Sequence, residues 1–372
     1  MEPLPVAVVI PAYNRAHLLP RAVASVAAQQ PCQPREIIVV DDASEDDTSA
    51  VARRLGAHVV RHETNQGPAA ARSTGFDATD APWVIQLDSD DEWLPHCLST
   101  LWALRDGHVL VSGGSVGRGT HGRAWYNGPV GRAPRVLNSP AALAFPDNFI
   151  ASSAALLRMD CVRAAGGYRT DLRYAEDLDL WLRMLELGTG IVTPTVVSLY
   201  HSHSEQATAK RGETQTGHTR VLELAAGRSW WDPRIAVRWS AVRHWDALHG
   251  AVRSRNVRAA LPHAAALPAH PQRLVGLAIL LQYRRQRRRR SARLTVTAFP
   301  SVAVLPGADY TPAEHDIDLR DAGPVAVLRR LVSRPPAVAI VGRRWQRPVL
   351  ALLRIRARSG RGTSTFAGSA QA

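Results

Sequence analysis

The chain has 372 residues, 45% of them hydrophobic, which is ample material for a core and predicts two or three domains, or one large domain with an appendage. Cys32, Cys97 and Cys161 are odd in number and lack any paired metal spacing, so neither a disulfide framework nor a zinc site is indicated, and a reducing cytoplasm is the expected location. We expect no signal peptide before the first strand, and no stretch reaches the roughly 18 to 20 apolar residues of a membrane span.

Charge is divided unevenly along the chain, whose formal net charge is +14. Residues 1–210 carry 18 Lys+Arg against 23 Asp+Glu, a net charge of −5, whereas residues 211–372 carry 28 against 9, a net charge of +19. This asymmetry predicts two unlike regions, an acidic one followed by a strongly basic one.

Short apolar segments alternate with helical patterns through the first hundred residues. Strands are expected at 6–10, 36–40, 57–61 and 84–87, and helices at 18–28, 47–55, 69–76 and 95–104. Because such alternation requires crossover connections, it predicts an α/β fold with a parallel sheet and right-handed crossovers.

Polar motifs follow three of these strands, at residues 11–14, 41–42 and 88–91. Ligands of open α/β sheets bind beyond the carboxyl ends of the strands, so the three motifs are expected on one edge. Asp88, Asp90, Asp91 and Glu92 lie within five positions, and carboxylates this crowded favour a hard divalent cation. The alternative is a solvated turn or a helix cap.

Six motifs occur in an order that resembles family 2 glycosyltransferases. They are Val-Ile-Pro-Ala-Tyr-Asn-Arg (9–15), Ile-Val-Val-Asp-Asp-Ala-Ser (38–44), Asn-Gln-Gly-Pro-Ala-Ala-Ala-Arg (65–72), Leu-Asp-Ser-Asp-Asp (87–91), Gly-Gly-Tyr (166–168) and Glu-Asp-Leu-Asp-Leu-Trp-Leu-Arg (176–183). The resemblance covers about residues 5–205. It implies a GT-A fold, which is a Rossmann-like, mostly parallel sheet flanked by helices, with a nucleotide-sugar donor, Mn²⁺ or Mg²⁺, and inversion at the anomeric carbon.

The same resemblance implies a set of residues that bind the nucleotide sugar: Pro11, Ala12, Tyr13, Asp41, Asp42, Asn65, Gly67, Arg72, Asp88 and Ser89. In it Tyr13 stacks on the base, Asp42 accepts the ring N–H of the base, and Asp41 lies nearer the ribose. Arg72 lies near the diphosphate, where its planar fork would match phosphate geometry. The structural alternatives are that Tyr13 packs the sheet edge and that Arg72 is a solvated charge.

The metal ligands implied by the resemblance are Asp88, Asp90, Asp91 and His203, with Asp90 the direct ligand. His203 matches the spacing of a Tyr-Arg-x-His pattern found in some family members, although this chain has His201 where Arg is usual. A lone histidine is as often structural or solvated.

Inversion in one displacement needs a base for the proton of the acceptor hydroxyl, and Asp177 is the candidate. Glu176 is expected to support acceptor binding, and Asp179 to be a solvated charge on the same helix. Apolar residues at 178, 181, 182 and 185 predict a helix that begins at the acids. The alternative is that these acids only stabilise the helix N-terminus.

The basic half predicts a different architecture. Helical spacing recurs over 235–252 and 257–267, and the apolar segment 274–281 precedes an arginine block at 284–290. Apolar residues beside clustered arginines are typical of an element that lies on an anionic membrane surface, the alternative being a solvated basic helix end. The predicted domains are a catalytic domain at 1–210, a helical, basic, membrane-surface region at 211–293, and an uncertain region at 294–372 with weak strand signals and a tail expected to be disordered.

The resulting functional hypothesis is an inverting glycosyltransferase that uses a nucleoside-diphosphate sugar, with UDP as the expected nucleotide, and a hydroxyl acceptor. Lipid-linked acceptors at the inner face of the plasma membrane, in polysaccharide, glycolipid or cell-envelope glycan synthesis, suit the basic half, which would hold the protein there peripherally. No nucleic acid is expected, because the arginine clusters lack aromatic interleaving. The alternative is a non-catalytic or nucleic-acid-binding protein that uses its basic half.

Overall fold

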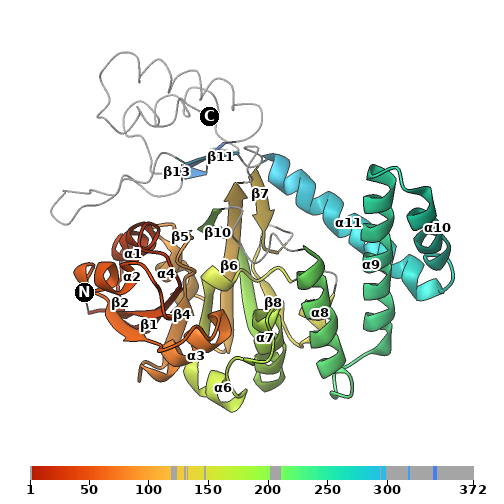
Figure 1. The fold of residues 1–372 in the computed structure, drawn as a ribbon. Helices are drawn as coiled ribbons and strands as arrows, with labels where there is room; N and C mark the ends of the chain where they lie inside the picture. The colour runs from red at the N-terminus through yellow and green to blue at the C-terminus, as the bar shows by residue number, and fades with distance from the viewer. Residues whose placement is uncertain are drawn as a thin grey trace.

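Four parallel strands form one side of the main sheet in the computed structural model, as the sequence predicts (Figure 1). The structure describes residues 2–118, 124–129, 131, 133–145, 148–201, 211–293, 295–298, 317–318 and 338–341. The four strands are β1 (Leu4–Ala12), β2 (Pro34–Asp41), β3 (His58–Arg61) and β4 (Trp83–Gln86), in the spatial order β3-β2-β1-β4. Val8 at the centre of β1 lies between Ile37 of β2 and Ile85 of β4.

Helices cover both faces of these strands, because alternate residues of each buried strand point to opposite sides. The helices are α1 (Leu19–Ala27), α2 (Thr48–Arg54), α3 (Pro68–Asp77) and α4 (Cys97–Trp102), all within the predicted segments to about one or two residues. Val6, Val8 and Ile10 belong to the hydrophobic cluster that includes α1 and α4, whereas Ala7 and Val9 belong to the cluster that includes α3. Gly75 lets α3 approach β1, since an added Cβ would lie 2.3 Å from a methyl group of Val9.

The second half of the sheet mixes strand directions, so the parallel arrangement expected for the sheet holds only for part of it. From β4 the order continues through β9 (Ala155–Arg158), β6 (Leu110–Arg118), β10 (Gly190–His201) and β5 (Glu92–Trp93). β9 and β5 run antiparallel to their neighbours, and β6 is parallel to β10. Because β9 reverses direction between β4 and β6, β10 ends at the same edge as β1, β2 and β4.

The Gly-rich segment 113–134 contains the end of β6 and a further strand. β7 (Ala124–Asn127) pairs with the end of β6, and β8 (Arg135–Leu137) pairs with the start of β10. Gly117 of β6 leaves the space that the ring of Trp125 fills. Gly117 therefore marks a position in a strand where a large side chain packs across the backbone, rather than a position in a loop.

Four further elements lie between β8 and β10 or beside β9: α5 (Ala141–Ala144), the 3-10 turn η1 (Ser152–Ala154), α6 (Met159–Ala164) and α7 (Glu176–Leu187). The helix α7 buries Leu178, Trp181, Leu182 and Leu185 in the same cluster as α3, which confirms the predicted helix and its apolar face.

The basic half forms the predicted helical extension, made of α8 (Arg211–Ala225), α9 (Pro233–Arg253), α10 (Val257–Ala266) and α11 (Pro271–Arg293). Val221 and Leu222 of α8 and Ile235 of α9 join the core cluster that contains α7. In Figure 1, α9 and α10 lie beside the sheet domain, and α11 returns from them toward β7. The predicted domain boundary at residue 210 falls in 202–210, which lies outside the described residues.

Among the described residues, no single helix has both the length and the apolar character needed to cross a membrane. The pair formed by Val257–Ala266 and residues 271–288, bent by 108°, meets that criterion jointly, by length and composition only.

Within the predicted region 294–372, short strands β11 (Thr295–Ala298), β12 (Ile317–Asp318) and β13 (Val338–Val341) form a separate sheet in the order β11-β13-β12. The expected disordered tail lies outside the described residues.

Candidate active site

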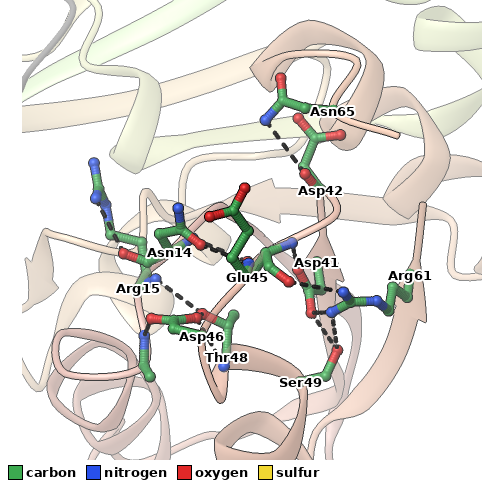
Figure 2. Close-up of polar contacts among 12 residues, drawn as sticks. Asn14, Arg15, Asp41, Asp42, Glu45, Asp46, Thr48, Ser49, Arg61 and Asn65 are labelled. Carbon is green, nitrogen blue, oxygen red and sulfur yellow. Dashed lines mark hydrogen bonds and ion pairs between the residues drawn. The ribbon is translucent and has the colours of Figure 1, made fainter. Parts of the chain in front are cut away.

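The loops that follow β1 and β2 are joined by hydrogen bonds into one unit (Figure 2). Asn14 has a φ of 53°, a left-handed conformation that Asn tolerates better than most residues. Its amide donates to Ser44 Oγ at 2.9 Å, and its side-chain oxygen accepts from the amide of Glu45 at 2.8 Å. The amide of Arg15 donates to Thr48 Oγ1 at 2.8 Å. The two loops therefore present a shared surface at the carboxyl edge of the sheet.

Tyr13 stands at this surface with 41% of its area exposed, whereas Pro11 and Ala12 are buried as the last residues of β1. An exposed aromatic ring at the end of a strand offers a face for stacking. The stacking role proposed for Tyr13 stays a prediction, and its alternative, packing on the sheet edge, would require a more buried ring.

Asp41 is completely buried at the end of β2, so the contact with ribose expected of it does not fit the structure. Its carboxylate accepts from the amide of Ser44 at 2.8 Å and from the side chains of Ser49 and Arg61 (Figure 2). Burial raises the pKa of Asp41, but the hydrogen bonds from Ser44 and Ser49 and the charge of Arg61 outweigh it and lower the pKa below its usual value. Asp41 therefore holds the loop between β2 and α2.

Asp42 binds the loop that precedes α3. One carboxylate oxygen accepts from the amide of Gln66 at 2.9 Å and lies 2.7 Å from His62 Nδ1; the other accepts from the amide of Gly67 at 2.8 Å. The carbonyl of Asp42 accepts from Asn65 Nδ2 at 3.3 Å (Figure 2). The contact of this carboxylate with the ring N–H of a base stays a prediction. Asn65 and Gly67 lie in the loop between β3 and α3.

The acidic turn after β4 separates into two exposed and two buried residues. Asp88 and Asp90 are partly exposed, whereas Ser89 and Asp91 are buried, with 7% and 3% of their surface exposed. The side chain of Asp91 accepts from Ser153 Oγ at 2.6 Å and from the amide of His201 at 3.3 Å. Burial, together with the charges of Asp88 and Asp90, raises the pKa of Asp91 well above its usual value. Asp91, expected to be a metal ligand, instead ties the turn to η1 and β10.

The end of β10 supports the same turn. His201 Nε2 lies 2.7 Å from Glu92 Oε1, which is also 3.0 Å from Arg21 Nε. Arg21 Nη2 donates to the carbonyl of Asp90 at 2.7 Å. His201 thus occupies the position expected for Arg and faces Glu92. His203, expected to be a metal ligand, lies outside the described residues.

Asp177 and Glu176 stand at the N-terminus of α7, as predicted. Ala175 precedes them with a φ of 62°, a conformation that costs a non-glycine residue free energy and is found preferentially at functional sites. Asp177 accepts from the amide of Leu178 at 2.7 Å and from Asn148 Nδ2 at 3.3 Å. Burial raises the pKa of Asp177 despite these bonds and despite the charge of Arg72. A carboxylate with a raised pKa is a stronger base than an ordinary aspartate.

Arg72 lies inside the protein, with 7% of its side chain exposed, and bridges two of these elements. Its Nη2 lies 2.7 Å from Asp88 Oδ1, its Nη1 lies 2.8 Å from Glu176 Oε1, and its guanidinium lies 5.7 Å from the centre of the Tyr168 ring. Burial in this bridge contradicts the expectation of a solvated charge at Arg72, whereas its contact with the diphosphate stays a prediction. Burial raises the pKa of Glu176, and the charge of Arg72 opposes that rise.

The family model for glycosyl transferase family 2 matches residues 7–161, which contain β1 to β4 and the acidic turn. This matched part of the chain, less than half of its 372 residues, is similar to glycosyl transferase family 2. The match ends before α7, so the placement of Asp177 in this glycosyltransferase rests on the structure and the motif alone.

Three relatives illustrate the similarity of this glycosyltransferase to known proteins. The succinoglycan biosynthesis protein ExoU of Rhizobium meliloti is 29% identical over 60% of this chain and 67% of its own. The pre-mycofactocin glycosyltransferase of Mycobacterium tuberculosis is 29% identical over 54% of this chain and 43% of its own. The GalNAc(5)-diNAcBac-PP-undecaprenol beta-1,3-glucosyltransferase of Campylobacter jejuni is 36% identical over 28% and 36%. The chain therefore spans two thirds of the first relative and less than half of the other two.

Solved structures share the fold at low sequence identity. Residues 1–349 of TarS from S. aureus, solved with UDP-GlcNAc, align with a TM-score of 0.54 at 18% identity, covering 77% of this chain and 82% of that chain. The mannosyltransferase PcManGT from Pyrobaculum calidifontis, solved with GDP-Man and Mn²⁺, aligns with a TM-score of 0.50 at 19% identity, covering 78% and 89%. These likenesses confirm the predicted GT-A fold.

Asp88 and Asp90 of this glycosyltransferase fit a divalent cation better than the full predicted set does. Within the described part of the chain, no three His, Cys, Asp or Glu side chains are grouped so that they could hold a metal ion. Mg²⁺ is usually held by one or two carboxylates together with substrate phosphates, and Mn²⁺ also prefers oxygen ligands. Two partly exposed carboxylates at the sheet edge are the donor set that such a shared site needs.

Several residues that build the site carry no signal in the sequence. Ser153, Arg21 and His62 contact the acidic residues from 62, 69 and 20 positions away in the chain. Asp179, expected to be solvated, is buried and lies 2.6 Å from Arg183, one turn later on α7. In the sequence these residues look like ordinary surface polar residues, because the partners they bind come near only when the chain folds. Asp179 and Arg183 are the exception, since their four-residue spacing on a helix could have indicated their pairing.

Proposed function

We propose that this protein is an inverting glycosyltransferase that moves a sugar from a nucleoside-diphosphate donor to a hydroxyl acceptor. The observation that carries the proposal is the bridge from Asp88 through Arg72 to Glu176, which holds the exposed acidic turn and the base candidate Asp177 in one assembly. Donor and acceptor could thus meet between the sheet edge and the N-terminus of α7.

The proposed reaction is a single displacement. Asp177 takes the proton of the acceptor hydroxyl while the acceptor oxygen bonds to the anomeric carbon of the donor. The bond between that carbon and the diphosphate breaks, and the nucleoside diphosphate leaves with the electron pair. Attack opposite the leaving group inverts the anomeric configuration. Asn148 donates a hydrogen bond to the carboxylate of Asp177 and so orients it, and the raised pKa of Asp177 makes this carboxylate a stronger proton acceptor than an ordinary aspartate.

Asp90, with the free oxygen of Asp88, would hold Mn²⁺ or Mg²⁺ against the donor diphosphate. When bound, such a cation supplies positive charge that stabilises the departing nucleoside diphosphate. Arg72 neutralises part of the charge of Asp88 and of Glu176, so three nearby carboxylates, Asp177 included, can coexist behind the diphosphate.

The donor is proposed to be a UDP-sugar, with Tyr13 stacked on the base. TarS, which shares the fold, was solved with UDP-GlcNAc, and PcManGT with GDP-Man and Mn²⁺, so nucleotide choice is the first point to test. The acceptor is proposed to be lipid-linked, because the Campylobacter jejuni relative is named for an undecaprenol-linked glycan and the Rhizobium meliloti relative for succinoglycan biosynthesis.

A donor screen tests the proposal directly. The full chain is melted with Mn²⁺ and each of a panel of UDP-, GDP- and dTDP-sugars, and one nucleotide class should stabilise it by about 2.7 kcal/mol at 100 times its Kd. Stabilisation should vanish in EDTA. If no nucleotide sugar stabilises the protein, while heparin binds with a steep dependence on salt, the nucleic-acid alternative replaces this proposal.

A further inference from the structure

Helix α10 presents apolar side chains to solvent on the side that does not pack on α9. None of its residues is buried, and Val257 and Leu261, one turn apart, are 69% and 63% exposed. Figure 1 places α10 beside α9 at the margin of the molecule, away from the main sheet. Large aliphatic side chains this exposed, on a helix with so little burial of its own, indicate a surface that another apolar medium covers.

Helix α11 continues the same pattern. Its inner side packs closely on α9, since an added Cβ on Gly276 would lie 2.8 Å from the Cα of Arg238, and Leu280 is only 2% exposed. On its outer side Leu274 and Leu281 are 48% and 40% exposed, and Arg285 and Arg288 follow at helical spacing and are also exposed. The outer side therefore changes from apolar to basic along the helix.

The charge of this region has one sign. Between Asp246 and Asp309 the sequence contains eleven arginines and no Asp or Glu. Such a run attracts an anionic surface and repels a second copy of itself.

Two arginines of the 284–290 block are engaged inside the protein, which changes the expectation that the whole block faces a membrane. Arg284 pairs with Asp246 of α9 through two contacts of 2.8 and 3.0 Å. Arg287 donates to the carbonyl of Tyr126 at 2.7 Å and lies over the ring of Trp125. These contacts hold α11 against α9 and β7 while Arg285 and Arg288 point to solvent.

We propose that the exposed sides of α10 and α11 bind an anionic lipid surface. We call this the lipid-facing surface and define it by Val257, Leu261, Leu274, Leu281, Arg285 and Arg288. Aliphatic side chains enter the boundary between headgroups and acyl chains, and the arginines contact anionic headgroups, as in helices that lie in the plane of a membrane. This inference goes beyond the proposed transfer reaction, because it would hold for any activity of the sheet domain.

The test measures binding of the full chain to vesicles of phosphatidylcholine, with and without phosphatidylglycerol. The protein should sediment with the anionic vesicles, remain in solution with the neutral ones, and be released by salt, since screening weakens attraction between exposed charges. R285Q/R288Q should weaken binding roughly 10- to 30-fold at low salt. V257S/L261S should also weaken it at least several-fold, while the salt dependence stays.

Matched controls change the same residue types elsewhere on the exposed surface. R53Q/R54Q removes two exposed arginines from α2, and L187S removes a leucine that is 47% exposed at the end of α7. Both should bind vesicles as the unchanged protein does.

Equal loss of binding in controls and test variants, or no preference for anionic vesicles, overturns the proposal. So does a dimer that V257S/L261S dissociates, seen by light scattering, because a second copy would then cover this surface. Donor stabilisation with Mn²⁺ should be unchanged in every variant, so failure here is distinct from failure of the proposed reaction.

Discussion

The guanidinium of Arg72 lies 2.8 Å from the carboxylate of Glu176, and these residues are separated by 104 positions in the chain. With its other nitrogen on Asp88, Arg72 joins α3, the acidic turn and α7 through one side chain. A planar fork can bridge two carboxylates in fixed geometry, whereas the point charge of a lysine cannot hold both in the same way.

Arg72→Lys should therefore lower kcat by about 10²-fold, because loss of positioning between the two halves of the site carries a cost of this order. Since the charge of Arg72 lowers the pKa of Asp177 and of Glu176, a weaker interaction should also move the acid limb of the kcat profile to higher pH. Kinetics across pH check both effects. An unchanged acid limb would contradict the assigned contact.

Asp177→Asn should separate chemistry from stability. Loss of the base should lower kcat by about 10² to 10⁴-fold with little change in donor affinity. The folded-state pKa of Asp177 is raised, so folding favours its protonated form. Protonation of Asp177 therefore contributes to folding stability below the ordinary pKa of 3.8, and this contribution is lost as pH rises through the raised value. At neutral pH the variant should therefore melt at a higher temperature than the unchanged protein. Calorimetry at pH 4 and pH 7 checks this, since the gain should shrink at pH 4.

Asp90→Asn and Asp91→Ala form a matched pair on one turn. Asp90 is partly exposed, so its substitution should abolish Mn²⁺-dependent donor stabilisation and leave the melting temperature of the protein alone unchanged. Asp91 is buried and accepts from Ser153 and from the amide of His201, so its removal should cost about 2 kcal/mol or more by leaving those donors without a partner. Melting curves with and without Mn²⁺ and donor distinguish the two. If Asp91→Ala abolished the Mn²⁺-dependent donor stabilisation and Asp90→Asn lowered the melting temperature, Asp91 would be assigned to the metal site instead.

Tyr13→Ala should weaken donor binding without affecting the fold, because the ring is 41% exposed. Stacking on a base contributes about 1 to 3 kcal/mol, so the donor Kd should rise between about 5- and 150-fold. Tyr13→Phe keeps the aromatic face and should bind donor normally. Calorimetric titration with the nucleotide identified in the donor screen measures both. Equal affinity for all three proteins would show that Tyr13 does not contact the base.

The alternation of buried strands with helices was predictable from the sequence, and so was the position of Asp177 at the start of a helix. Both depend on the periodicity of neighbouring residues, such as the continuous apolar run at 6–10 and the spacing of Leu178, Trp181 and Leu185. The order of the motifs along the chain likewise indicated the family without any knowledge of contacts.

Which acids remain available for a ligand was decided only by the tertiary structure. Asp91 looks like its neighbour Asp90 in sequence, yet Asp91 is buried against Ser153 whereas Asp90 is partly exposed. Asp41 and Asp42 are both buried, the first against Arg61 and the second against His62. The partners that bury a carboxylate come from distant segments, and the free energy of burial depends on whether those partners are present. The hairpin of β6 and β7 escaped prediction for a related reason: its glycines are explained by the Trp125 ring that lies across Gly117, a contact that exists only once the strands have paired.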